Sequence, residues 1–151
     1  MSRILPGLVS VTFRKLPPAE VINLVREANL KAIEWGGDIH VPHGDTARAR
    51  DVRQHTEDSG LVVAAYGSYY RVGISEKEGL SFQSVLDTAV SLGAPLIRVW
   101  AGTKNSSDAD EEHWKMIADE SRLIADAAAS ANIVVAFEYH RRTIGLALMR
   151  L

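Results

Sequence analysis

The chain has 151 residues, of which 46% are hydrophobic and 24% charged, and its formal net charge is -2. This length suits one domain with a buried core, and the nearly balanced charge gives no basic field to attract nucleic acid or an anionic membrane surface. The absence of cysteine excludes disulfides, thiolate metal sites and a cysteine nucleophile. The first ten residues carry one charge, and no stretch approaches about 18 apolar residues. No signal peptide or membrane span is therefore expected, and we predict a cytoplasmic protein.

Strands and helices alternate in the predicted secondary structure. Several short apolar runs follow helices that end in Gly or Asn, which is the usual end of a helix before a strand. In chain order we predict a strand over 7–13, a helix opened by Pro17-Pro18, a strand over 31–35 and a helix over 45–59 with Asp45 or Thr46 as its cap. A strand over 61–66, a long connection over 67–80 and a helix capped by Ser81 follow. The last predicted elements are a strand over 96–100, a helix over 109–131 and a strand over 133–139.

The spacing of the strand segments predicts their connection. Four of them begin at residues 31, 61, 95 and 133, which are 30, 34 and 38 residues apart. Each interval holds one helix and two loops, as in a βα unit, so the sequence predicts a single α/β domain over residues 1–151 with parallel strands. Ligands of such domains gather at the carboxyl ends of the strands, where we expect the functional residues. Residues 143–151 are long enough only for a short apolar helix.

Two chemically active side chains end the last predicted strand. Strand alternation places Glu138 and His140 on one side and Phe137 and Tyr139 on the other. A carboxylate in so apolar a strand must be neutralised, paired or bound to a metal. Glu138 is therefore the first candidate for a functional residue. An ion pair with a lysine or arginine is the structural alternative.

Two more charges lie inside predicted strands. Glu34 is the fourth residue of the segment that begins at Lys31, and Arg98 is the fourth of the segment that begins at Pro95. In a closed barrel, alternate strands contribute side chains to the same layer. We therefore predict an ion pair between Glu34 and Arg98 inside the sheet.

The loops and aromatic residues give weaker signals. His40 and His43 are three positions apart on a loop that contains proline, a spacing that favours substrate contact or solvation over metal ligation. Hydroxyl groups and an arginine occur together over 68–71, a combination that can hold a sugar or a phosphate. Trp35 and Trp100 are interpreted as apolar packing in preference to platforms on which a sugar ring stacks.

Four segments, taken together, resemble the xylose isomerase-like TIM barrels, the sugar phosphate isomerase/epimerase group. They are Ile33-Glu-Trp-Gly-Gly-Asp-Ile-His-Val-Pro, Ala64-Ala-Tyr-Gly-Ser-Tyr-Tyr-Arg, Leu92-Gly-Ala-Pro-Leu-Ile-Arg-Val-Trp-Ala-Gly and Val135-Ala-Phe-Glu-Tyr-His. The resemblance covers residues 7 to about 143. It implies a (β/α)₈ barrel with a divalent ion, Mn, Mg, Co or Zn, held by carboxylates and a histidine at the carboxyl ends of the later strands.

The resemblance also implies roles for particular residues. Glu138 matches the first metal-binding glutamate of the family, which in the isomerases and epimerases also lies near the proton that moves. His40, Tyr66 and Arg98 match positions that line the pocket, and His140 is expected to contact the substrate. The implied activity is metal-dependent proton transfer on a small polyhydroxylated substrate, a sugar or sugar phosphate.

The chain departs from the family pattern after its fifth strand. Strands six to eight, which supply the other metal ligands, have no counterpart, so we expect an incomplete, truncated barrel of about five strands and four to five helices. One carboxylate cannot hold a catalytic ion, which generally takes three or more protein ligands. The chain by itself is therefore expected to retain metal poorly and can be inactive.

Two alternative functions stay open. A half barrel without activity would self-associate as a homo-oligomer, because its open sheet edges can pair with those of another copy. A flavodoxin-like binding domain of five strands also fits the length, although Arg14-Lys-Leu-Pro-Pro, after the first strand, forms no phosphate cradle. No nucleic-acid or membrane partner is expected, and the endonuclease branch of the superfamily fits poorly because a basic excess is missing.

Overall fold

The computed structural model describes residues 4–140 and 143–144. Its strands and helices alternate along the chain, as the spacing predicts. The elements are β1 (Gly7–Val9), the 3₁₀ helix η1 (Ser10–Phe13), α1 (Pro18–Glu27), β2 (Ala32–Gly36), α2 (Thr46–Asp58), β3 (Val62–Val72), α3 (Phe82–Leu92), β4 (Leu96–Ala101), α4 (Glu111–Ser130) and β5 (Val134–Phe137).

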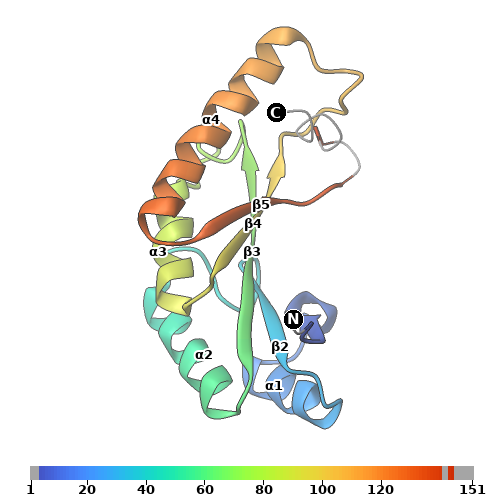
Figure 1. Ribbon diagram of the computed structural model, residues 1–151, viewed down its shortest axis with the longest axis vertical. Helices are drawn as coiled ribbons and strands as arrows, with labels where there is room; N and C mark the ends of the chain where they lie inside the picture. The colour runs from blue at the N-terminus through green and yellow to red at the C-terminus, as the bar shows by residue number, and fades with distance from the viewer. Residues whose placement is uncertain (1–3, 141–142, 145–151) are drawn as a thin grey trace.

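The described strands form one parallel sheet in the order β1-β2-β3-β4-β5 (Figure 1). Each strand pairs with the next strand in sequence, and the intervening helix returns the chain to the same end of the sheet. This sequential order is the repeating βα arrangement of a TIM barrel, and five strands make up part of one. The prediction of parallel βα units in an incomplete barrel is confirmed.

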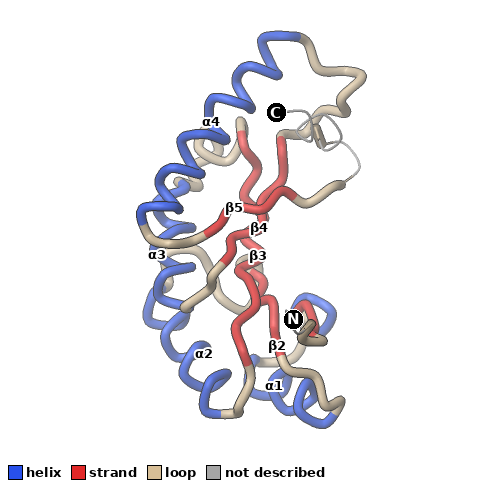
Figure 2. The backbone as a smooth tube through the Cα atoms, viewed as in Figure 1, coloured by secondary structure: helices blue, strands red, loops and turns tan. Residues whose placement is uncertain are grey.

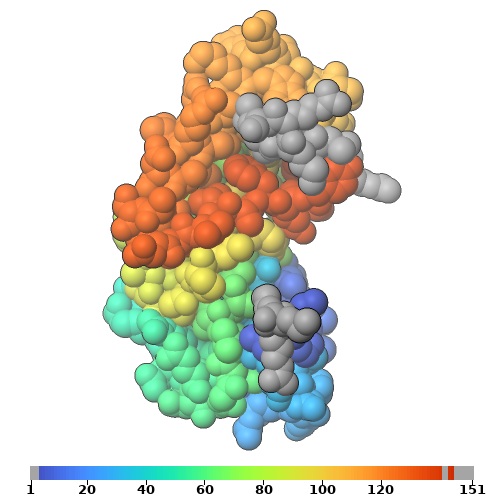
Figure 3. Space-filling view, in the orientation of Figure 1, coloured from blue at the N-terminus to red at the C-terminus, as the bar shows by residue number. Residues whose placement is uncertain are grey.

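The helices cover one face of the sheet and leave the other open. Figure 2 shows α2, α3 and α4 side by side along the outer, convex side of an arc, with the strands on its inner side. The space-filling view shows the same arc, hollowed on the side away from the helices (Figure 3). We call the side of the sheet that faces this hollow the concave face. Side chains of the concave face are therefore the ones that a ligand can reach.

The apolar core lies between the sheet and its helices. Every second residue of a strand points to the helices, and several of these residues, Ile33 and Trp35 in β2 and Ile97 and Val99 in β4, have no exposed surface. They pack on apolar helix residues that are equally buried, namely Val21, Val25, Val52, Val85, Ala89 and Leu92. The opposite residues of the same strands are left for the concave face.

The helix boundaries follow the caps that the sequence predicts. Asp45 accepts a hydrogen bond from the Arg48 amide at the start of α2, and Ser81 accepts one from the Ser84 amide at the start of α3. Gly93 ends α3 with a left-handed backbone, at φ +71°, which glycine adopts without steric cost. No described helix is long and apolar enough to cross a membrane.

Most predicted boundaries lie within two residues of the observed ones, and β5 ends at Phe137 where the prediction extends to 139, but two strand ends differ by more. The first strand ends at Val9 and not at Phe13, because the chain turns into η1 at Ser10, whose buried hydroxyl accepts a hydrogen bond from the Gly36 amide. The third strand does not end at Tyr66: β3 continues to Val72, with an irregularity between Gly67 and Arg71 in its pairing with β4. A bulge of this kind lets a strand resume after a local break. The predicted short helix over 143–151 lies almost wholly outside the described residues.

Candidate functional site

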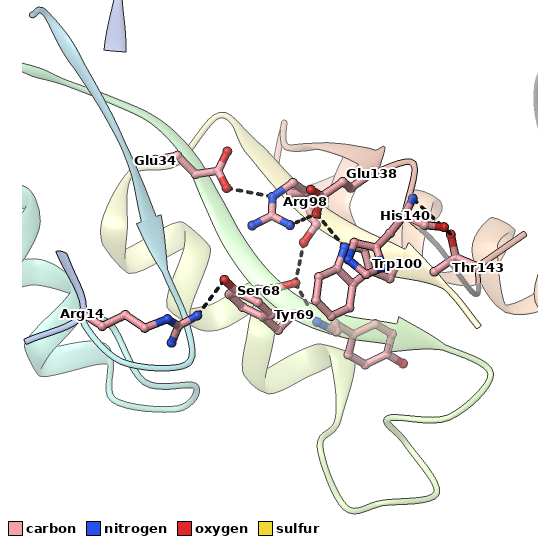
Figure 4. A network of polar contacts seen from close by, with 10 residues as sticks. Arg14, Glu34, Ser68, Tyr69, Arg98, Trp100, Glu138, His140 and Thr143 are labelled. Carbon is pink, nitrogen blue, oxygen red and sulfur yellow. Dashed lines mark hydrogen bonds and ion pairs between the residues drawn. The ribbon is translucent and has the colours of Figure 1, made fainter. Parts of the chain in front are cut away.

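Arg98 joins two carboxylates on the concave face of the sheet (Figure 4). Its Nε donates to Glu34 Oε1 at 2.7 Å, and its Nη1 donates to Glu138 Oε2. The three side chains come from β2, from β4 and from the residue that follows β5, so they converge only in the folded sheet. The predicted Glu34–Arg98 ion pair is confirmed, and so is the structural alternative for Glu138, an ion pair with an arginine.

A glycine makes room for this ion pair. Gly67 lies on β3, between the strands that carry Glu34 and Arg98, and is in register with Gly36 and Arg98. A Cβ at Gly67 would lie 2.7 Å from Glu34 Oε1 and 2.8 Å from Arg98 Nη2, closer than real Cβ atoms approach. A side chain at residue 67 would force the ends of these two flexible side chains to shift, so glycine gives the ion pair its space across β3.

Trp100 belongs to the same cluster and is not simply apolar packing. It lies two residues after Arg98 on β4, and its Nε1 donates to Glu138 Oε2 at 2.6 Å. The Glu138 oxygen thus accepts from both Arg98 and Trp100. The Trp100 ring packs against Tyr69 and His140, as the interpretation of packing expects, and in addition its polar edge orients a carboxylate.

The electrostatics of the cluster keep Arg98 charged. Burial by itself lowers the pKa of Arg98, but hydrogen bonding and charge attraction from Glu34, with attraction from Glu138, outweigh it and raise the pKa above its ordinary value. Arg98 and Glu34 expose 16% and 19% of their side chains, whereas Glu138 exposes 38%. Glu138 is therefore the carboxylate of this group that is most open to a ligand.

The bulge in β3 places Tyr69 beside the cluster. Tyr69 has φ +58°, a left-handed conformation that is rare for a bulky residue and marks local strain. The Ser68 hydroxyl donates to the Arg98 carbonyl at 2.7 Å, where the regular strand pairing is interrupted. The Tyr69 ring lies 5.4 Å from the Arg98 guanidinium carbon, and the Tyr69 hydroxyl accepts a hydrogen bond from Arg14.

His140 lies on the other side of Trp100. The two ring centroids are 5.2 Å apart and their planes are inclined by 33°. Its backbone is held by Thr143, whose hydroxyl donates to the His140 carbonyl at 2.7 Å. Glu138 and His140 both contact Trp100, which agrees with the prediction that they share one side of the chain. We call Glu34, Tyr69, Arg98, Trp100, Glu138 and His140 the Arg98 cluster.

His40 and Tyr66 lie in a second group, which we call the Tyr66 cluster. The Tyr66 hydroxyl donates to the Val41 carbonyl at 2.9 Å and is 2.7 Å from His43 Nδ1. His40 is 2.9 Å from the Ser10 hydroxyl through Nδ1 and 3.1 Å from the Leu16 carbonyl through Nε2. Both side chains are buried. The structure does not bring them to the Arg98 cluster, so their roles in substrate binding stay predictions.

Burial controls the acid-base behaviour of the Tyr66 cluster. It lowers the pKa of His43 and raises the pKa of Tyr66, so both groups are held neutral at neutral pH. Neutral groups that bond to each other and to backbone carbonyls satisfy a buried site without any ligand. This arrangement fixes the loop after β2 onto β3.

The described residues do not form a metal centre by themselves. No group of three or more His, Asp, Glu or Cys side chains converges among them. Residues 1–3, 141–142 and 145–151 contain no residue of these four types. Glu138 supplies one carboxylate, its Oε2 is occupied by Arg98 and Trp100, and Glu34 lies on the far side of Arg98. A catalytic ion takes about three protein ligands, so the expected metal does not fit this donor set alone.

Sequence reasoning missed the polar role of Trp100. It proposed the hydroxyl groups and arginine of 68–71 as a sugar or phosphate contact, but it did not place Ser68 and Tyr69 within a strand. Strand alternation already places Trp100 on the same face as Arg98, so its indole N–H could have been assigned to the cluster. Tyr69 and Ser68 fall in the predicted connection over 67–80, because the predicted strand ends at Tyr66. Nothing in the local sequence predicts that the backbone of Tyr69 turns left-handed within a continuing strand.

Solved structures of other proteins share the fold of this chain. No curated protein matches the chain. Among solved structures, the probable 3-DHS dehydratase AsbF, involved in petrobactin synthesis, from Bacillus anthracis is 20% identical, with a TM-score of 0.76, over 93% of this chain and 54% of that chain. The 3-keto-D-glucoside 4-epimerase YcjR from E. coli is 18% identical, with a TM-score of 0.70, over 95% of this chain and 59% of that chain. The chain thus spans little more than half of these proteins.

A third similar structure is named for its xylose isomerase domain. The xylose isomerase domain containing protein stm4435 from Salmonella typhimurium LT2 is 16% identical, with a TM-score of 0.68, over 94% of this chain and 54% of that chain. At these identities the structures share the fold. Residues 22–145 also match the family described as xylose isomerase-like TIM barrel. The chain belongs to the xylose isomerase-like TIM barrel family.

Proposed function

We propose that the chain carries the proton-transfer part of an isomerase or epimerase site for a small polyhydroxylated substrate, with Glu138 as the residue that takes up the proton. The observation that carries this proposal is the state of the Glu138 carboxylate. Its Oε2 is held by Arg98 and Trp100, and among the described residues no donor contacts Oε1. The carboxylate is partly exposed at the carboxyl end of β5, on the concave face.

This arrangement suits general base chemistry. Two donors orient the carboxylate through one oxygen, which leaves the other oxygen to accept a proton from a carbon or hydroxyl of the substrate. Arg98 is itself held by Glu34 on β2, so a residue two strands away helps to fix the position of the guanidinium that orients Glu138. The fold relatives named as a probable 3-DHS dehydratase and a 3-keto-D-glucoside 4-epimerase support a sugar-like or polyol substrate. Because the donor set does not fit a complete metal centre, we assign no step to a metal ion.

Hydrogen exchange from solvent tests the proposal across a range of substrates at once. The full chain is incubated in D₂O with a panel of aldoses, ketoses and keto sugars, with and without Mn²⁺, and deuterium incorporation next to the carbonyl is followed by NMR. We expect Glu138→Gln to lower the exchange rate by about 100-fold or more, the usual contribution of a positioned base. Glu112→Gln is the matched control, because Glu112 is an exposed carboxylate in the first turn of α4. Equal exchange by Glu138→Gln and the parent chain would overturn the assignment.

Self-association is a second candidate function, and exposed apolar residues on the concave face favour it. Val62 and Val134 expose 49% and 61% of their surfaces. By strand alternation they face away from the helices, as Glu34, Arg98 and Glu138 do. In the described sheet, β1 and β5 each have one neighbouring strand, so both edges can pair with another copy.

A charge on the concave face tests self-association. We expect light scattering on a sizing column to show a dimer or larger species for the parent chain and a shift toward the monomer for Val134→Lys. Val90→Lys is the matched control, because Val90 is 49% exposed but lies on α3, on the outer side. A monomeric parent chain, or equal shifts in both variants, would contradict this candidate.

A further inference from the structure

The arginines near the concave face differ in whether a carboxylate neutralises them. Arg98 contacts Glu34 and Glu138, and Arg14 contacts Asp38. Arg71 is different: it is exposed, and among residues 4–140 and 143–144 no carboxylate lies within ion-pair distance of its guanidinium. Its guanidinium lies over Trp100, whose ring centroid is 5.0 Å from the guanidinium carbon.

The backbone of Arg71 is held in place on both sides. Its amide donates to the Ser75 hydroxyl at 2.8 Å, and its carbonyl accepts from the amides of Ile74 and Ser75. Arg71 is also in register with Trp100 across the β3–β4 pairing, so the two side chains leave the sheet on the same face. The cation is therefore anchored at a defined position above Trp100.

Trp100 connects this cation to the proposed base. The indole Nε1 donates to Glu138 Oε2 at 2.6 Å, and the ring is packed between Tyr69 and His140. Arg71 lies over the same indole. The guanidinium of Arg71 and the carboxylate of Glu138 are therefore separated by little more than one indole ring and one hydrogen bond.

A guanidinium in this position is suited to an anion. A guanidinium that lies over an aromatic ring uses its face for that contact, whereas its N–H donors lie in its plane and match a carboxylate or a phosphate. Because Arg98 is already neutralised by two carboxylates, it offers little net attraction to an anionic substrate. Arg71 provides that attraction at the rim of the same site.

We propose that Arg71 binds an anionic group, a carboxylate or a phosphate, of the polyhydroxylated substrate whose proton Glu138 takes up. The inference rests on the proposed function and adds that the substrate is a sugar acid or a sugar phosphate and not a neutral sugar. Arg71 contacts the anion, Trp100 supports the guanidinium, and the uncharged part of the substrate extends over the indole toward Glu138.

Binding of three matched probes tests the inference. The full chain is titrated with sorbitol, gluconate and sorbitol 6-phosphate, which share a six-carbon polyol chain but differ in charge, and calorimetry gives each Kd. We expect at least one of the anions to bind about tenfold or more tightly than sorbitol, and Arg71→Gln to remove that advantage. Arg71→Lys should restore it only in part, because lysine lacks the planar fork.

Arg122→Gln is the control for net charge, because Arg122 is an exposed arginine of α4 that pairs with Asp119. It should leave all three Kd values unchanged. A larger effect of Arg71→Gln on gluconate or on sorbitol 6-phosphate identifies the group that is recognised. Equal affinity of the parent chain for the three probes, or equal anion affinity in Arg71→Gln and the parent chain, would overturn the inference.

Glu138→Gln separates this inference from the proposed function. It should abolish solvent exchange but leave the anion preference intact. A chain with an anion preference that depends on Arg71, but with no exchange above that of Glu138→Gln, would refute the proposed function alone. Exchange that depends on Glu138 without any anion preference would refute the role of Arg71 alone.

Discussion

The Arg98 cluster and the Tyr66 cluster both lie near the carboxyl ends of the strands, but they differ in charge and exposure. In the Tyr66 cluster, burial favours the neutral forms of His43 and Tyr66, and the hydrogen bonds of the cluster lead to the carbonyls of Val41 and Leu16. The Arg98 cluster contains two carboxylates and one guanidinium, with Glu138 partly open to solvent. The family resemblance of the sequence predicts that residues of both clusters line one pocket.

The difference shows how a structural polar group can be told from a functional one at the same end of a barrel. A buried neutral network whose polar atoms bond to the backbone needs no ligand and stabilises the fold. A charged network that leaves a carboxylate oxygen without a donor retains capacity for a substrate. Position at the carboxyl ends of the strands is therefore not sufficient to assign function.

The largest expected effect on stability comes from removing the cation of the Arg98 cluster. Arg98→Met leaves Glu34 and Glu138 without their partner in a partly buried site, and we expect the free energy of unfolding to fall by roughly 3 kcal/mol. Urea denaturation followed by circular dichroism measures the change. Glu34→Gln alone should cost less, because Arg98 keeps its contact with Glu138.

The double variant checks that the two residues act together. Glu34→Gln combined with Arg98→Met should cost clearly less than the sum of the single changes, because the second change removes one of the charges left unpaired by the first. Strict additivity would show that the ion pair across Gly67 does not couple β2 to β4.

An intermediate effect is expected from the hydroxyl of Tyr66. Tyr66→Phe removes the hydrogen bond to the Val41 carbonyl and the contact with His43 in a buried site, which should lower stability by about 1 to 3 kcal/mol. Tyr69→Phe is the matched change in the Arg98 cluster, where the hydroxyl contacts the exposed Arg14. It should leave stability nearly unchanged. If both variants lose the same stability, the proposed contrast between the clusters is wrong.

The smallest effect is a dependence of stability on pH that arises from His43. Burial lowers the pKa of His43 in the folded chain below its ordinary value of 6.5. At a pH between the lowered pKa of the folded chain and the ordinary pKa of 6.5, His43 binds more protons in the unfolded chain than in the folded one. The contribution of neutral His43 to stability is therefore full above about pH 6.5 and is lost as the pH falls through the folded pKa. Urea denaturation at several pH values should show a weaker loss of stability for His43→Asn. An unchanged pH profile would place the titration on another group.

Much of the fold followed from local sequence patterns. The apolar runs that begin near residues 31, 61, 95 and 133 identified four strands, and the caps Asp45 and Ser81 located two helix starts. The layering of a barrel also predicted that Glu34 and Arg98 pair, and an ion pair with a lysine or arginine was the structural alternative for Glu138. These inferences succeed because the period of a strand and the spacing of βα units determine which side chains share a face.

The tertiary structure decided the features that depend on contacts between strands. The early end of β1 depends on the Ser10 hydroxyl meeting Gly36, and the continuation of β3 to Val72 depends on Ser68 meeting the Arg98 carbonyl. The division of the predicted pocket into two clusters is also tertiary, because the direction of Tyr66 and His40 depends on the bulges and loop beside them. The sequence by itself determined the βα units and the charged residues of the concave face. It also predicted the Glu34–Arg98 pair, but the contact of Trp100 with Glu138 was decided only where distant strands pack together, because no local pattern records contacts between segments tens of residues apart.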